Sequence, residues 1–432
     1  MSGKIQIRII AYEFVSILTI LLELLLESNN TNKELLIFAG LFCMGQIIFI
    51  VWNQKKNALL FLSSLFIVYF LYSVVVRVYL QVDDLPYIFR YTAVTRMELL
   101  RSAVIVQIFF CVYVYTIKSG SEINQNVFKE SGRCNKYIVW TCALVCLLSP
   151  FLFYDASNGY GKRGSISSPL YEYTCLFVLI GMMYSGRKKK NLFALAMASG
   201  FWCLHGLAYG ERAPALTVVI IWGCYLILPR ITSGLILLCS MAGITLFSLV
   251  GSFRGISNFS LAGIQEALEG MLTERFASDT AYYAYQAGNA IVRFESYNSM
   301  LERIRYGLGY IKYIFAGGRV QAGNLSMIVQ NNPGTFHQGG GWIMFYAHFW
   351  GGAAAVFLVG AYVAFIINKS FALKSSNETY WNYLALYIVG TVPRWFLYSP
   401  AQITRGVFIY SIVYGFFYLI YRFTTKSVKQ RI

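Results

Sequence analysis

One histidine lies where the sequence brings together several groups that could take part in chemistry. His337 comes two residues before three consecutive glycines, Gly339-Gly340-Gly341, at the end of a long polar segment. Because glycine has no Cβ atom, the backbone there can approach a ligand closely. An imidazole at this position can bind a phosphate group when it is protonated, or accept a proton from an attacking hydroxyl group when it is neutral. The sequence leaves both roles open.

Six arginines form a second pattern that could do chemistry. They lie within or beside apolar stretches, mostly toward one side of the predicted membrane, and they are Arg77, Arg101, Arg212, Arg254, Arg394 and Arg405. A charge deep in the bilayer costs roughly 2.5–3.5 kcal/mol, so we expect an anionic ligand to offset it. The guanidinium group suits a diphosphate because its planar fork donates two parallel hydrogen bonds. For each arginine alone, extension of the side chain to the membrane surface explains its position equally well.

Composition indicates the kind of protein that must position these residues. Of the 432 residues, 57% are hydrophobic and 13% are charged, whereas a soluble domain carries about 25% charged residues. We therefore predict a polytopic all-α integral membrane protein, with residues 1–432 forming a single membrane domain. The net charge of +17 then reflects topology and not binding to nucleic acid. The nine cysteines lack the spacing of metal ligands, so neither a metal site nor a disulfide framework is predicted.

Twelve apolar stretches can cross a membrane, since about 20 apolar residues span a hydrocarbon core of roughly 30 Å. They fall near residues 7–27, 35–52, 58–80, 97–117, 137–154, 169–185, 191–208, 213–229, 231–250, 341–367, 380–398 and 403–422. Residues 251–340 form one long loop between the ninth and tenth stretches. Most connections run only about 4–6 residues and long ones are usually functional, so we expect the substrate to bind at this loop.

Lysine and arginine are distributed unevenly among the segments that join these stretches. If the N-terminus lies inside, the inner segments hold 19 of them and the short outer segments hold 6. The positive-inside rule then predicts that both termini are cytoplasmic and that the long loop is periplasmic.

The long loop is expected to contain helices. Apolar residues recur at helical spacing over residues 261–276, and Asp279 can cap a second helix that runs to about Ile304. Such amphipathic helices would lie on the membrane surface or fold over the mouth of a cavity. The many glycines from Gly307 to Gly341 argue against regular structure there, which suits a segment that lines a substrate.

Two short motifs resemble the bacterial O-antigen polymerase and O-antigen ligase superfamily. The stretch from His337-Gln338 through an apolar span to Gly351-Gly352 resembles its pattern of a histidine, a polar residue, a span and closely spaced glycines. The turn Gly210-Glu211-Arg212 resembles its short outer Gly-x-Arg turn between two spans. The predicted architecture also agrees over nearly the whole chain, with about twelve spans and one large periplasmic loop late in the sequence.

The resemblance implies a GT-C-like fold and a periplasmic glycosyltransferase of the bacterial inner membrane that uses no cofactor. A growing glycan on undecaprenyl diphosphate would be transferred to the nonreducing end of a new lipid-linked repeat unit. At the matching positions, Arg212 would bind the diphosphate and His337 would lie at the site of glycosyl transfer. Membrane lipid and a polysaccharide chain-length regulator are the further partners implied. Three glycines stand where ligases have a longer apolar stretch, which favours a polymerase.

Other interpretations stay open at this point. A flippase for the same lipid-linked oligosaccharide would also have about twelve spans, but no internal repeat is visible and the arginines favour one end. An O-antigen ligase would share the chemistry and differ in its acceptor. His205 and His348 lie inside predicted spans and are expected to be packing or hydrogen-bonding residues. As proton acceptors, six loop carboxylates compete with His337: Glu266, Glu269, Glu274, Asp279, Glu295 and Glu302.

Overall fold

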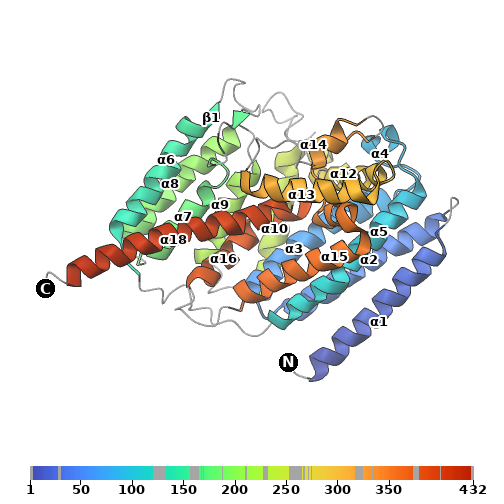
Figure 1. The fold of residues 1–432 in the computed structure, drawn as a ribbon, viewed down its shortest axis with the longest axis horizontal. Coiled ribbons are helices and arrows are strands. Elements are labelled where there is room, and N and C mark those ends of the chain that lie inside the picture. Colours follow the sequence, from blue (N-terminus) through green and yellow to red (C-terminus); the bar gives the residue numbers. More distant parts are fainter. Residues whose placement is uncertain are drawn as a thin grey trace. The chain divides into compact units, whose positions relative to one another are not determined.

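Helices make up nearly all of the chain in the computed structural model (Figure 1). The structure describes residues 3–27, 31–119, 133–155, 165–166, 168, 170–186, 188–209, 212–226, 232–252, 265, 268–270, 272–273, 275–316, 325–332, 335–337, 339–372, 379–398 and 400–429. Arg254 lies outside these residues. Within them, two short strands pair antiparallel, β1 (Tyr154–Asp155) and β2 (Ser165–Ile166).

The chain packs as two compact units, each made of segments that are distant in sequence. Unit 1 contains α1 (Gly3–Leu25), α2 (Lys33–Gln54), α3 (Ala58–Val74), the π-helical turn η1 (Val75–Tyr79), α4 (Tyr87–Tyr91), α5 (Arg96–Tyr113), η2 (Val114–Ser119), α10 (Ser233–Ser252), α12 (Asp279–Glu295), α13 (Met300–Ala316), α14 (Leu325–Gln330) and nearly all of α15 (Ile343–Ser370). Unit 2 contains α6 (Lys136–Phe153), β1, β2, α7 (Thr174–Tyr184), α8 (Lys189–Ala208), α9 (Arg212–Leu226), α16 (Thr379–Gly390) and α18 (Ala401–Lys429). Helix α17 (Val392–Leu397) begins in unit 2 and ends in unit 1. That these two units belong to one membrane domain, as the sequence predicts, stays a prediction.

Eight helices among the described residues are long and apolar enough to cross a membrane: α1, α2, α3 with η1, α5 with η2, α6, α8, α15 and α18. All eight coincide with predicted spans. The other four predicted spans carry α7 and α9, which are shorter, α10, and the pair α16 and α17, which is interrupted at Thr391. The chain is therefore an all-α membrane protein, as the composition predicts.

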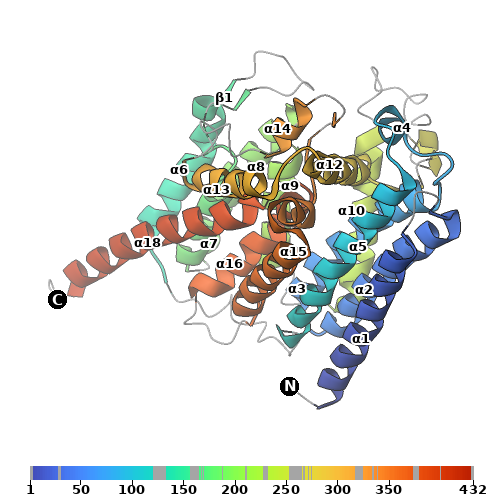
Figure 2. The same ribbon diagram turned by 45° about the vertical axis from the view of Figure 1, so that its right-hand side comes forward.

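Unit 1 is built around α12, which belongs to the predicted loop. Helices α1, α2 and α5 pack side by side (Figures 1 and 2), and α12 packs against α3, α4, α5 and α14. Gly288 allows a close approach, because a Cβ atom at this position would lie 2.1 Å from the Phe345 ring. Twelve of the seventeen residues of α12 are buried. Helix α12 was predicted to lie on the membrane surface or to fold over the mouth of a cavity, and the structure shows that most of it is buried within unit 1.

The second half of the predicted loop is more regular than expected. Instead of one helix reaching Ile304, α12 ends at Glu295 and α13 begins at Met300. Helix α13 continues through Gly307, where the expected irregular stretch was to begin, and α14 follows later. A Cβ atom at Gly307 would lie 3.5 Å from the Trp350 side chain. Packing against this tryptophan explains how a glycine-containing stretch remains helical, because tertiary contacts override weak helix propensity.

Unit 2 consists of closely packed apolar helices. Helix α6 packs against α7 and α8, while α9 packs against α8 and α16. Gly390 brings α16 onto α9, since a Cβ atom there would lie 3.0 Å from the carbonyl oxygen of Thr217. Asn135 caps α6, because its side chain accepts hydrogen bonds from the backbone amides of Tyr137 and Ile138. Helix α18, which carries Arg405, packs against α7 and α16.

Candidate functional site

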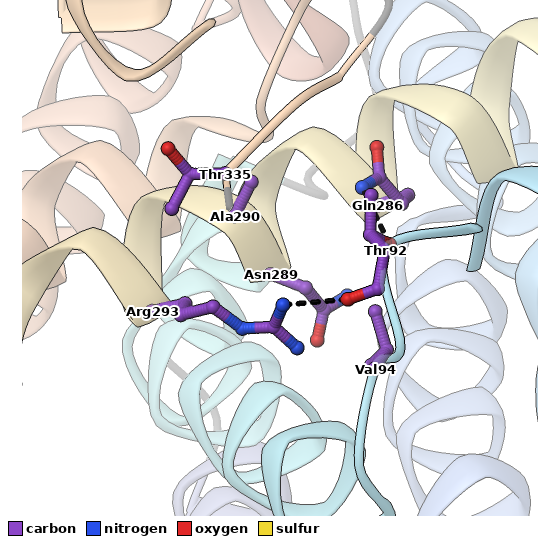
Figure 3. A pocket seen from close by; sticks show the side chains of 7 residues that line it. All are labelled: Thr92, Val94, Gln286, Asn289, Ala290, Arg293 and Thr335. Carbon is purple, nitrogen blue, oxygen red and sulfur yellow. Dashed lines mark hydrogen bonds between the residues drawn. The ribbon is translucent and has the colours of Figure 1, made fainter. Parts of the chain in front are cut away.

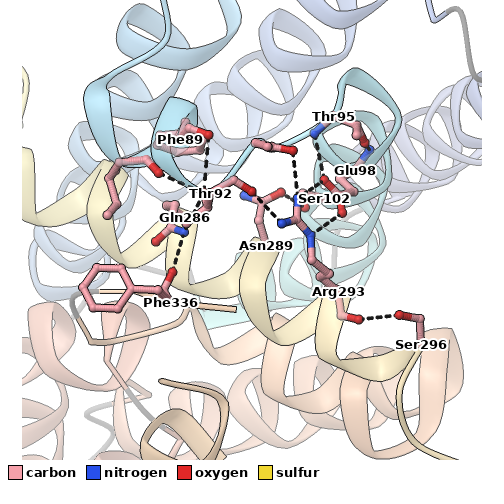
Figure 4. Close-up of polar contacts among 12 residues, drawn as sticks. Phe89, Thr92, Thr95, Glu98, Ser102, Gln286, Asn289, Arg293, Ser296 and Phe336 are labelled. Atoms are coloured by element: carbon pink, nitrogen blue, oxygen red, sulfur yellow. Dashed lines mark hydrogen bonds and ion pairs between the residues drawn. The ribbon is translucent and has the colours of Figure 1, made fainter. Parts of the chain in front are cut away.

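Helix α12 carries a row of polar side chains into the interior of unit 1. Gln286, Asn289 and Arg293 are three and four residues apart, so they share one face of the helix. This face lies against the turn at residues 92–95 and the start of α5 (Figure 4). Gln286 and Asn289 are buried, and buried polar groups need partners within the protein.

Arg293 joins three elements of unit 1. Its guanidinium group donates to both carboxylate oxygens of Glu98, from Nε to Oε1 at 2.7 Å and from Nη2 to Oε2 at 2.6 Å. It also donates to the carbonyl oxygens of Thr92 at 2.6 Å and Ala93 at 3.1 Å. Ala93 has a φ of 47°, in the left-handed region that non-glycine residues seldom adopt. The bidentate pair therefore holds α12, a strained turn and α5 together.

Glu98 is fixed from its own side by the cap of α5. The Thr95 hydroxyl accepts a hydrogen bond from the Glu98 amide at 3.2 Å, and Glu98 Oε2 accepts one from the Thr95 amide at 2.8 Å. This reciprocal arrangement is a capping box. The carboxylate that receives Arg293 is thus held in place before α12 docks.

Further along α12, two hydrogen-bonded pairs continue the polar row. Ser102 donates to Oδ1 of Asn289 at 2.7 Å. The hydroxyl oxygens of Tyr79 and Tyr285 lie 2.5 Å apart, and the Tyr79 hydroxyl donates to the carbonyl oxygen of Leu99 at 2.8 Å. Since the single proton of Tyr79 is used for Leu99, Tyr285 donates to Tyr79. Tyr79 ends the π-helical turn η1, which directs its side chain toward α12.

A small hollow lies beside Arg293 (Figure 3). It is lined by Thr92, Val94, Gln286, Asn289, Ala290, Arg293 and Thr335. The lining side chains leave no space for a water-sized molecule. Gln286 donates to the Thr92 hydroxyl and to the Phe336 carbonyl oxygen, which closes one wall. The hollow is a packed polar seam and does not have room for a sugar.

His337 is buried, and its imidazole ring contacts only other protein groups. Its side chain has no exposed surface, Nε2 lies 3.0 Å from the carbonyl oxygen of Ser326, and Nδ1 accepts a hydrogen bond from the Gly339 amide at 2.9 Å. The two contacts assign a neutral ring with its proton on Nε2. Burial lowers the pKa of His337 to about 4, although the Ser326 carbonyl opposes this shift. In this conformation both ring nitrogens are occupied, so the imidazole orders the loop.

The three glycines after His337 are required by the backbone. Gly339, Gly340 and Gly341 have φ angles of 101°, 90° and 120°, which favour glycine. A Cβ atom at Gly341 would also lie 2.7 Å from Ile291, whereas at Gly339 it would meet nothing within 4 Å. The Gly341 amide donates to the carbonyl oxygen of Leu397 at 3.0 Å. The glycines thus serve close packing at Gly341 and leave space only beside Gly339.

Two of the six predicted arginines lie in the described part of unit 1, and each has its own partner. Arg77 donates to Gln81 at 3.0 Å. Arg101 donates to the carboxylate of Glu27 at 2.5 Å, and half of its side-chain surface is exposed. Nothing in the described contacts brings these two arginines together with His337.

The remaining arginines are distributed differently. Arg394 and Arg405 belong to unit 2, and both guanidinium charges act electrostatically on Tyr173. Arg394 is paired with Glu172 at 2.7 Å, and 13% of its side-chain surface is exposed. Arg212 opens α9 in unit 2, and its side chain lies outside the part of the chain that the structure describes, as does Arg254. The structure therefore places Arg394 and Arg405 in the same unit, and the grouping of all six arginines stays a prediction.

Sequence reasoning missed the polar face of α12. Neither Arg293 nor Glu98 was among the predicted site residues. The spacing of Gln286, Asn289 and Arg293 was visible, and a polar face repeated at helical spacing is the signal that could have found it. The partner Glu98 could not be identified, because it lies 195 residues away in the sequence. Among the described residues, no group of three or more histidine, cysteine and acidic side chains could hold a metal ion.

We expect Arg293→Met to destabilise unit 1 by about 3–5 kcal/mol, because it leaves the Glu98 carboxylate without its cation. The paired variant Arg293→Met/Glu98→Gln should lose less than the sum of the two single changes, since the groups act on each other. Thermal melting of purified protein in detergent measures all three. Arg305→Met, at an exposed position of α13, is the control and should change stability by at most about 0.5 kcal/mol. Additive losses for the pair would contradict the coupling.

The pKa of His337, lowered to about 4, predicts a loss of stability in acid. In the unfolded chain the imidazole titrates near its ordinary value of about 6.5, so protons favour the unfolded state between these values. The contribution is complete above about pH 6.5 and falls by roughly 3 kcal/mol as the pH decreases to 4. Melting of His337→Gln measured beside the wild type should show a difference that narrows on acidification. A difference that stays constant between pH 7 and 4.5 would rule out a buried neutral imidazole.

Known proteins give no information on the function of this site. Comparisons of the sequence with family models and curated proteins, and of the fold with solved structures, found no match. A function for the chain is therefore argued from its own residues and from the short motifs around Arg212 and His337.

Proposed function

We propose that the chain is a glycosyltransferase of the O-antigen polymerase type. It takes a growing glycan from undecaprenyl diphosphate and joins it to the nonreducing end of a new lipid-linked repeat unit. The observation that carries the proposal is the burial of α12 and the His337–Gly341 loop in a unit of membrane helices. Helix α12 and the described residues of this loop are thus packed firmly within unit 1, and well-packed elements are what a reaction site needs.

The leaving group requires positive charge. The reaction builds negative charge on the diphosphate oxygen, which arginines can stabilise. In unit 2, Arg394 and Arg405 are the arginines that we assign to this role, and Arg394 is held in place by its pair with Glu172. Arg212, which opens α9 in the same unit, completes the proposed diphosphate site. No cofactor or metal takes part in the proposed reaction.

The proposed architecture has twelve spans in a GT-C-like arrangement. The eight long apolar helices account for eight of them, and α7, α9, α10 and the α16–α17 pair supply the others. The charge asymmetry of the connecting segments supports an inner-membrane protein with both termini in the cytoplasm and residues 251–340 in the periplasm. The lipid-linked oligosaccharide would then reach its site from the outer leaflet, with a chain-length regulator as a further partner.

Reporter fusions test this orientation. A fusion after Lys190 should report the cytoplasm, because it follows a cluster of basic residues. A fusion after Lys369 should do the same, because this residue lies at the predicted inner end of a span. A fusion after Ala316, within the long loop, should report the periplasm. Alkaline phosphatase and a fluorescent protein, which are active on opposite sides, provide the two readouts. A cytoplasmic signal from the Ala316 fusion would reject both the topology and the periplasmic reaction.

Polymerisation in detergent separates the enzyme from a flippase. Purified protein given lipid-diphosphate repeat units should build a ladder of longer glycans, because bond formation needs neither a gradient nor two compartments. A flippase would leave the substrate unchanged. In cells, loss of the polymerase should leave a single repeat unit on the lipopolysaccharide core, whereas loss of the flippase should leave none.

Arg212→Ala should abolish the ladder and Arg212→Lys should restore little of it, since a point charge cannot replace the bidentate fork.

A further inference from the structure

A second histidine, His348, lies in a charged cluster, although the sequence predicted only a packing or hydrogen-bonding role for it. The cluster joins Glu295 at the end of α12, Arg303 in the first turn of α13, and His348 in α15. Glu295 Oε1 pairs with Arg303 Nη1 at 2.6 Å, and Glu295 Oε2 lies 2.9 Å from Nδ1 of His348. The side chains of Glu295 and His348 each keep 23% of their surface exposed. His348 is thus reachable, unlike His337.

A break in α15 fixes the position of His348. Gly351 and Gly352 have non-helical backbone angles, and Gly352 has a φ of 63°. The carbonyl oxygens of His348 and Phe349 therefore lose their helical donors four residues later. Arg303 replaces those donors, with hydrogen bonds to Phe349 at 2.5 Å and to His348 at 2.9 Å. A cation at a helix C-terminus is also favourable for the helix dipole.

The Glu295–His348 contact has the layout of a carboxylate that orients a base. With Nδ1 against the carboxylate, the lone pair for accepting a proton is on Nε2. The 2.9 Å contact lacks hydrogen-bond geometry, since neither atom has a hydrogen-bond partner among the described residues. Catalytic hydrogen bonds are often poorly aligned before the substrate binds and tighten in the complex. Arg303 pairs with the other oxygen of Glu295, which holds the carboxylate in place.

Aromatic side chains flank this cluster. The rings of Tyr310 and Trp350 lie 4.5 Å apart, and Arg303 lies over the Phe349 ring at 5.7 Å. Nε1 of Trp350 is buried without a hydrogen-bond partner within the described part of the chain. A buried donor of this kind is costly unless an acceptor arrives. Tyr310 and Phe349 are buried, whereas Trp350 keeps part of its surface exposed. A partly exposed aromatic face near a donor and a carboxylate suits a sugar, which offers both C–H groups and hydroxyl oxygens.

We propose that His348 is the general base of the glycosyl transfer, with Glu295 and Arg303 as its positioning residues. This inference rests on the proposed function. The hydroxyl proton of the acceptor sugar moves to Nε2 of His348 while the hydroxyl oxygen forms a bond to the anomeric carbon of the donor. The bond from that carbon to the diphosphate oxygen breaks, and its electron pair leaves with undecaprenyl diphosphate. His337, whose ring nitrogens are both occupied, orders the loop and takes no proton.

The test compares variants of purified full-length protein in the ladder assay. His348→Gln should lower turnover by about 10²–10⁴-fold, while the melting temperature and the binding of lipid-diphosphate repeat units remain as in the wild type. His348→Ala should recover part of its turnover when imidazole is added, because free imidazole can act as the missing base. Glu295→Gln should lower turnover by a smaller factor with little change in KM. His205→Gln, in unit 2, is the matched control and should match the wild type.

Each other outcome overturns the proposal. A His348→Gln protein that is folded and builds ladders at the wild-type rate removes His348 from the reaction. Loss of activity with a lower melting temperature and no rescue by imidazole assigns His348 a purely structural role. A wild-type protein that binds the lipid-linked oligosaccharide and never extends it rejects the proposed function together with this inference. The wild-type lane therefore tells the two failures apart.

Discussion

The placement of α12 depends on the pair of hydrogen bonds between Arg293 and Glu98. A helix with so many polar side chains gains little from burial in an apolar interior, and each buried polar group costs free energy unless it is paired. Arg293 supplies that pairing for a carboxylate and for two backbone carbonyl oxygens at once. The contact also needs Glu98 to be fixed beforehand, which the capping box at Thr95 achieves. Packing of a polar helix among membrane helices is therefore made possible by a small number of charge-assisted hydrogen bonds.

Once α12 is seated, the rest of the polar segment has few alternatives. Its last residue, Glu295, meets Arg303, and Arg303 in turn caps the broken end of α15. Its middle receives the glycine loop, where Gly340 approaches Ala284 and Gly341 approaches Ile291. The loop and the helix thus form one packed structure. A substitution in α12 can therefore disturb both His337 and His348, although the two histidines do not contact each other in the described structure. This arrangement explains why the two have opposite environments: His337 is sealed within the loop, while His348 lies at an open helix end.

The sequence was sufficient to predict the positions of the eight long apolar helices, because an apolar stretch of about 20 residues is typical of a membrane span. It was insufficient for α12, since an amphipathic pattern shows that a polar face exists and does not show whether that face meets water or other polar side chains. The same ambiguity affected the histidines. His337 was singled out for its place beside three glycines, yet the positive φ angles that explain those glycines also bury the ring. His348 was set aside because it lies in a span, and the break at Gly351 and Gly352 that frees its helix end could not be foreseen. Ion pairs such as Glu172 with Arg394 join residues too distant in sequence to be matched without a structure.

The discontinuous make-up of unit 1 has a consequence for how the protein is made. Tyr79 and Tyr285 are 206 residues apart, and Glu98 waits for Arg293 over nearly the same interval. At about 5–20 residues per second, the ribosome delivers the second member of each pair roughly ten to forty seconds after the first. All of α6 to α9 is synthesised in between. During that time the first helices hold polar groups whose final partners do not yet exist, so early unit 1 must be sheltered by lipid headgroups, water or the insertion machinery until α12 arrives.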